Sequence, residues 1–240
     1  MKPFKRHRFW GALGFSRQLL IIAVGSFVIS SILISAIILQ LVDRQSREIL
    51  LAQQGEISAM VASRIDNSLE ERQKLLEMFT QQLVVDDQLR PTTELQSLLD
   101  NRRSLHHFFN GGRVLLNKAG RSIIDSPIVP GRSGIDFSDR PHVKRAHSTK
   151  STVITQPLIG RGLKSPVFVI NTPILNSQRE VVGFLFGVTQ LASDNLFRQI
   201  GREMLGQSAS HMVIEPNLEI IITASRPELA MQSIHDSEMI

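Results

Sequence analysis

The chain has 240 residues, of which 42% are hydrophobic, 20% charged and 5% aromatic, and its formal net charge is +5. This composition excludes a disulfide-stapled miniprotein, a collagen-like repeat and a charge-rich disordered chain. Because the sequence contains no Cys, it also excludes a cysteine nucleophile, an iron–sulfur cluster and a Cys-ligated zinc ion.

The excess positive charge lies entirely in the first 42 residues. This segment contains no acid and five cations, so residues 43–240 carry no net charge; the cations are Lys2, Lys5, Arg6, Arg8 and Arg17. A nucleic-acid-binding domain is expected to carry a basic patch on its folded part. We therefore predict no nucleic-acid partner.

Residues 18–42 contain no ionisable side chain. A helix of this length measures about 37 Å, and the hydrocarbon core of a bilayer is about 30 Å thick. We predict a transmembrane helix here. The alternatives are a cleaved signal peptide, whose apolar core is shorter, and a buried core helix. Trp10 and the preceding cations place the N-terminus in the cytoplasm and the rest of the chain outside the membrane.

A long helix is predicted after this stretch. Apolar residues recur mostly three or four positions apart from Ile57 to Leu83, with no Pro between them. The length of this pattern favours a stalk or a dimer helix. Pro91 ends it, and Thr93 with Gln96 resembles a capping box that starts a second, short helix.

The pattern then changes from helix to strand. A hairpin is predicted from strands at 113–117 and 122–125, with Gly120 in the turn. Ser138 as a cap and Pro141 in the first turn predict a short helix that ends near residue 147.

Further strands are predicted at 152–159, 166–175 and 181–191, and their short connections imply antiparallel pairing. A helix then runs from Ser193 to about Met204. A strand, a turn and a strand at 212–222 repeat the pattern of 114–124, which suggests a second, similar module.

The predicted fold class is α+β, with a transmembrane helix, a long amphipathic helix, an antiparallel sheet module with flanking helices, and the start of a second module. The expected segments are a basic arm (1–17), the span (18–42), the long helix (43–90), a membrane-distal module (91–205) and an incomplete membrane-proximal module (206–240).

Three segments, 134–143, 165–174 and 181–187, together resemble the double Cache domains of bacteria, which are PAS-like extracytoplasmic sensors in chemoreceptors, histidine kinases and diguanylate cyclases. The resemblance implies a chain of the bacterial inner membrane, with most of it in the periplasm, and a homodimer formed through the long helix. It also implies a small-molecule ligand between the short helix and the sheet, and an output domain, most often a diguanylate cyclase, outside these residues.

Candidate ligand-binding residues follow from this resemblance. Arg140 offers a planar fork for a carboxylate or phosphate, with an ion pair to Asp136 or Asp139 as the alternative. His142 is a candidate donor or pH sensor. The remaining candidates are Asp139 and three aromatic or amide residues on strands that are expected to face the short helix, Phe168, Asn171 and Phe109.

The expected ligand is anionic but is not an α-amino acid. The amino-acid-binding members of the family follow the Arg with an aromatic pair, where this chain has His142 and Val143, and the chain contains no Tyr.

No motif predicts a metal, a cofactor or a catalytic residue. His106 and His107 are adjacent, and neighbours in sequence do not converge on one face of a helix or strand. Gly160-Arg161-Gly162 lacks the flanking pattern of a phosphate loop and is interpreted as a basic hairpin turn. Two functions remain open: the sensor input of a larger signalling protein, or a complete single-span, non-catalytic partner or decoy of such a sensor.

Overall fold

The computed structural model describes residues 15–205, 212–215, 217, 219–224 and 229–234. The chain divides into two compact units, Met1–Ala59 and Met60–Ile240. The cations at positions 2–8 and Trp10, on which the predicted membrane orientation depends, lie outside the described residues.

Helix α1 (Phe15–Thr80) is continuous over 66 residues and includes both the predicted span and the predicted long helix. The absence of Pro from this range allows the backbone hydrogen bonds to continue without a break. In the first unit, large apolar side chains from Leu19 to Ile38 are exposed. No helix among the described residues is both long and apolar enough to cross a membrane, so the predicted span is not confirmed.

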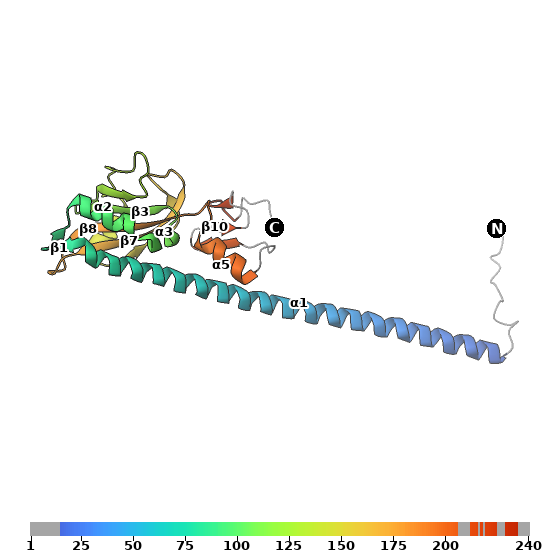
Figure 1. Cartoon of the computed structure of the whole chain (residues 1–240). Helices are drawn as coiled ribbons and strands as arrows, with labels where there is room; N and C mark the ends of the chain where they lie inside the picture. Colours follow the sequence, from blue (N-terminus) through green and yellow to red (C-terminus); the bar gives the residue numbers. More distant parts are fainter. Residues whose placement is uncertain (1–14, 206–211, 216, 218, 225–228, 235–240) are drawn as a thin grey trace, which may run out of the picture. The chain divides into compact units, whose positions relative to one another are not determined.

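The second unit contains the sheet and the shorter helices (Figure 1). After α1 the elements are η2 (Gln81–Leu83), β1 (Val84–Val85), β2 (Gln88–Leu89), α2 (Thr92–Asn101), α3 (Arg103–Phe108), β3 (Gly112–Asn117), β4 (Ser122–Ser126), α4 (Pro141–Thr149), β5 (Val153–Ile154), β6 (Leu158–Ile159), β7 (Pro166–Leu175), β8 (Val181–Gln190), α5 (Leu196–Leu205), β9 (Met212–Glu215) and β10 (Ile220–Ala224).

The main sheet has the strand order β4-β3-β8-β7-β5, and β6 also pairs with β7. Every pairing in this sheet is antiparallel, which confirms the prediction from the short connections. At its centre, Val114 of β3 lies opposite Phe186 of β8, and Val169 of β7 lies opposite Val188 of β8.

The two faces of the sheet bury different apolar cores, because successive strand residues point to opposite faces. One core joins Ile170 and Leu185 to α1 through Leu76 and Phe79. The other joins Val169 and Phe186 to α4 through Val143 and Ala146, together with the loops that flank this helix. The second core forms the walls of the candidate site.

Several local predictions are corrected. Helix α2 begins as expected, but its N-cap is Pro91 and no side chain caps it, so the capping box of Thr93 and Gln96 does not form. Pro141 is the first residue of α4, and the N-cap is Arg140 rather than Ser138.

The strand predicted at 152–159 is two short strands, β5 and β6, that both pair with β7. Pro157 lies between them and has no N–H to donate to a continuous ladder. The hairpin predicted near the C-terminus is present as β9 paired with β10. The connection from Gly206 to residue 211 lies outside the described residues.

Candidate functional site

A cavity lies on the α4 face of the sheet, between the first turn of α4, the 160–163 turn and strands β3, β7 and β8. We call it the α4 pocket. Its volume is about 40 Å³. Its apolar walls are Val114, Phe137, Leu158, Leu163, Val167, Val169, Phe186 and Val188, and the charged or titratable side chains that line it are Arg132, Arg140, His142 and Arg161.

Arg132 and Arg161 already have partners in this pocket. Arg132 is 2% exposed, forms a buried ion pair with Asp125 and donates hydrogen bonds to the carbonyl oxygens of Gly111 and Pro127. Arg161 donates two hydrogen bonds, of 2.9 and 2.7 Å, to the carboxylate of Asp139. Its Cζ atom lies 5.9 Å from the ring centroid of Phe137. These contacts hold the 160–163 turn against the loop that precedes α4.

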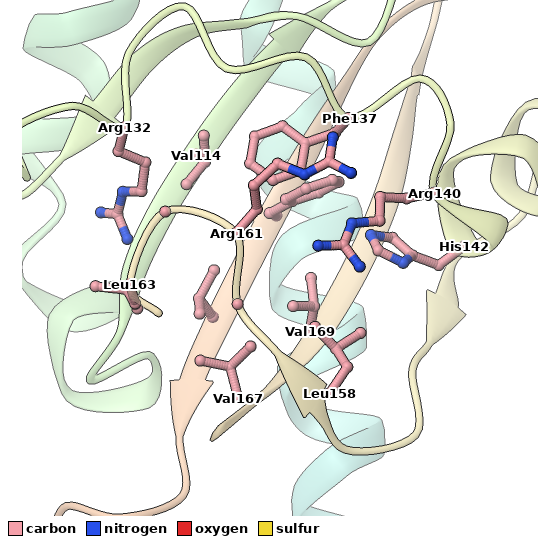
Figure 2. Close-up of a pocket in the computed structure, with 14 residues that line it drawn as sticks. Val114, Arg132, Phe137, Arg140, His142, Leu158, Arg161, Leu163, Val167 and Val169 are labelled. Carbon is pink, nitrogen blue, oxygen red and sulfur yellow. The ribbon is translucent and has the colours of Figure 1, made fainter. Parts of the chain in front are cut away.

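Arg140 differs from the other two arginines. Its backbone ends the loop before α4, and its carbonyl oxygen accepts hydrogen bonds from the N–H groups of Val143 and Lys144. Its half-buried side chain makes no hydrogen bond or ion pair with any described residue and extends toward the middle of the pocket (Figure 2). The guanidinium is therefore available to an anion.

His142 lies beside Arg140 at the pocket and is 8% exposed. Its ring packs against Phe186, with ring centroids 5.4 Å apart, and its Nε2 atom has no hydrogen-bond partner among the described residues. Burial and the positive charge of Arg140 lower the pKa of His142 from 6.5 to about 4, against a smaller opposing effect of Asp139. His142 is therefore neutral at physiological pH.

The arrangement suits one small anion. A guanidinium in a partly enclosed, apolar site binds an oxyanion more strongly than the same group does in water. The first turn of α4 adds the positive end of a helix dipole. Within the described part of the chain, no three His, Asp or Glu side chains lie close enough together to hold a metal ion.

Comparisons with known proteins identify the fold. No protein-family model matches the sequence, and no curated protein sequence is similar to it. Solved structures do match. The ligand-binding domain of the Pseudomonas fluorescens chemoreceptor CtaA in complex with L-serine has a TM-score of 0.61 and 21% identity, over 80% of this chain and 79% of that chain.

The ligand-binding domain of the Pseudomonas aeruginosa amino acid chemoreceptor PctC in complex with GABA has a TM-score of 0.59 and 19% identity, over 77% and 80% of the two chains. An extracellular ligand binding receptor from Desulfohalobium retbaense has a TM-score of 0.62 and 14% identity, over 75% of this chain and 32% of that one. The fold is that of a chemoreceptor ligand-binding domain. The sensor-domain resemblance is thus confirmed at the level of fold.

Within this fold, the predicted site residues separate into two groups. Arg140 and His142, two of the predicted ligand-binding residues, both line the α4 pocket. Asp139 is exposed and is bound to Arg161, whose hydrogen bonds lower the pKa of its carboxyl group. Asn171 does not line the pocket, but it donates a 3.0 Å hydrogen bond to the backbone carbonyl of His142 and so fixes the start of α4.

Phe168 and Phe109 lie on the other face of the sheet, in the core that contains α1. The expectation that they face the short helix is therefore wrong. Phe168 packs edge-on against Phe197, with ring centroids 5.9 Å apart, and the ring of Phe109 fills the space that a Cβ atom at Gly187 would occupy.

The sequence missed Arg132 and Arg161 as lining residues. Both lie in loops, and only the arginine between Gly160 and Gly162 gave a signal. A Cβ atom at Gly162 would lie 2.8 Å from Cγ of Arg132, so this glycine allows the turn to approach the buried arginine.

Proposed function

We propose that this chain is a sensor module that binds a small anionic molecule in the α4 pocket. The observation that carries the proposal is the side chain of Arg140, a cation without a partner among the described residues, inside a cavity. The fold supports it, because similar folds bind GABA or L-serine in the solved structures named above. The residues at the pocket suggest binding and no catalytic step.

A ligand screen tests this proposal. The full chain, purified in detergent, is screened by thermal shift against carboxylates, polyamines and nucleobases. We expect stabilisation by one or more anions, and we expect Arg140→Gln to abolish it, because the amide cannot replace the charge. Arg179→Gln removes an exposed arginine away from this pocket and serves as the control. Stabilisation that persists in Arg140→Gln would place the ligand elsewhere.

We propose that residues 18–42 anchor the module in a bacterial inner membrane, with the N-terminus in the cytoplasm and the second unit in the periplasm. What supports this is the series of exposed apolar side chains from Leu19 to Ile38, since such a surface needs cover from lipid or protein. The chain lacks native Cys, so single cysteines report topology directly. In intact cells, a membrane-impermeant maleimide is expected to label Lys118→Cys and not Lys5→Cys.

We further propose that the module is the input of a larger signalling protein, such as a diguanylate cyclase or a related receptor, and that it acts as a homodimer. The support is the resemblance of the sequence motifs together with the shared fold. Sequencing the gene beyond the codon of Ile240 tests the first point, because an in-frame output domain is expected. A stop codon there would favour the partner or decoy function.

Cross-linking through Met60→Cys on the exposed side of α1 tests the proposed homodimer.

A further inference from the structure

The charges that line the α4 pocket are not balanced. No Asp or Glu side chain lines the cavity. Arg132 is paired with Asp125, and Arg161 is paired with Asp139, which leaves the charge of Arg140 as the uncompensated one among the described lining residues. A ligand with one negative charge fits this count. An ammonium group would find no carboxylate to accept its hydrogen bonds.

The rest of the pocket is apolar and small. Its volume of about 40 Å³ compares with about 10–15 Å³ that one water molecule needs on the same measure, so the pocket holds a ligand of only a few non-hydrogen atoms. Valine and phenylalanine side chains from β3, β7 and β8 form the floor. A phosphate or sulfate ion would leave several oxygens against these side chains without donors, and unpaired polar atoms are costly to bury. A flat anion with a short hydrocarbon tail avoids this cost.

We propose that the ligand is a short-chain aliphatic monocarboxylate, with its carboxylate at the guanidinium of Arg140 and Nε2 of His142 and its alkyl group on Val167 and Val169. This inference rests on the proposed function and names its ligand class. Arg140 supplies the charge. His142 supplies a neutral N–H donor from an atom that is buried and has no partner among the described residues. Asn171 holds that histidine in place through its backbone carbonyl.

The test compares small anions on the full chain in detergent by isothermal titration calorimetry. The probes are acetate, propionate and butyrate. Propionamide, L-alanine, GABA and inorganic phosphate represent the other ligand classes and are titrated for comparison. We expect acetate or propionate to bind most tightly, and each of the other four compounds at least about tenfold more weakly. Propionamide lacks the charge, L-alanine and GABA carry an ammonium group that no lining carboxylate accepts, and phosphate buries oxygens without donors. Butyrate is expected to bind more weakly than propionate because the cavity limits the tail.

Two variants distinguish an effect on the α4 pocket from a general loss of folding. Arg140→Gln is expected to weaken propionate binding by about tenfold to a hundredfold. Val169→Ala enlarges the floor and is expected to improve butyrate relative to acetate by about fourfold, the value of one buried methylene. A merely structural role for Val169 would not change the preference for chain length.

The outcomes separate this inference from the proposed function. If L-alanine, GABA or phosphate binds as tightly as propionate and depends on Arg140, the α4 pocket is a ligand site and the monocarboxylate assignment is overturned. If none of the probes binds in a way that depends on Arg140, the monocarboxylate assignment is overturned, and the proposed function fails with it when the wider thermal-shift screen also yields no ligand that depends on Arg140. A preference for short monocarboxylates that shifts in Val169→Ala supports both.

Discussion

His142 is buried and neutral, and this makes the stability of the second unit depend on pH. In the unfolded chain its pKa is near 6.5, whereas burial and Arg140 hold it at about 4 in the folded state. Between these values the unfolded state binds more protons than the folded state. The free energy of unfolding therefore has its full value above pH 6.5. As the pH drops toward 4, it falls by on the order of 3 kcal/mol.

The measurement is urea denaturation of the full chain, followed by circular dichroism at pH 7 and pH 4.5. We expect the wild type to lose about 2 kcal/mol more than His142→Leu, which has no titrating group at this position. His147→Gln changes an exposed histidine on the same helix and is expected to behave like the wild type. Equal losses in the wild type and in His142→Leu would contradict the depressed pKa.

The buried ion pair of Arg132 and Asp125 contributes to the stability of the second unit. Both side chains are 3% exposed, so Arg132→Met leaves a buried carboxylate without its cation and is expected to cost about 3–5 kcal/mol. Arg121→Met breaks an exposed pair with Asp136 and is expected to cost at most about 1 kcal/mol. Chemical denaturation measures both. A second change, Asp125→Asn, removes the unpaired charge while keeping an acceptor for the N–H of Val129, and it should recover much of the loss in Arg132→Met. No recovery would mean that the unpaired carboxylate is not the main cost.

At the scale of elements, strand β8 depends on two glycines for its close contacts. A Cβ atom at Gly183 would lie 2.6 Å from the backbone oxygen of Leu116, and one at Gly187 would lie 2.4 Å from the ring of Phe109. We expect Gly183→Ala and Gly187→Ala each to lower the free energy of unfolding by about 1–3 kcal/mol. Adding Phe109→Leu should relieve part of the cost of Gly187→Ala and none of the cost of Gly183→Ala. Equal relief of both would contradict these contacts.

The same strands show what a sequence pattern can predict. The bounds predicted for β7, 166–175, match the structure, because turn residues such as Asn176 and Gly162 frame an apolar run. The sequence did not predict on which face of the sheet each residue of β7 lies. Both alternating sets in β7 are apolar and buried, so Phe168 gave no sign that it lies on the α1 side while Val167 and Val169 line the pocket.

The candidate site was partly predictable for a related reason. Arg140 and His142 lie next to a Pro that marks the first turn of a helix, and this local signal fixed their place. Arg161 and Arg132 reach the pocket through pairings between distant segments. Asp139, 22 positions before Arg161, was expected to touch the ligand, and its bidentate bond to this arginine has no local signature.

At the scale of the whole second unit, one sheet supports both apolar cores. Leu76 of α1 packs on one face, and Val143 of α4 packs on the other, while β7 and β8 contribute alternate residues to each core. Neither face can lose its packing without exposing strands that the other face needs. A ligand that stabilises the α4 face therefore also stabilises the contacts of α1 residues 60–80, by mass action on a shared unfolding step.

The two faces of the sheet are therefore expected to unfold together. Hydrogen exchange in rising urea, read by mass spectrometry, should show peptides from 61–80 and 141–149 losing protection at the same midpoint. Leu76→Ala, at a fully buried position, is expected to cost about 2–5 kcal/mol and to shift both midpoints equally. Met78→Ala, at an exposed position of the same helix, should shift neither. Separate midpoints in the wild type would mean that α1 and α4 are anchored independently, and a ligand at Arg140 would then have no energetic route to α1.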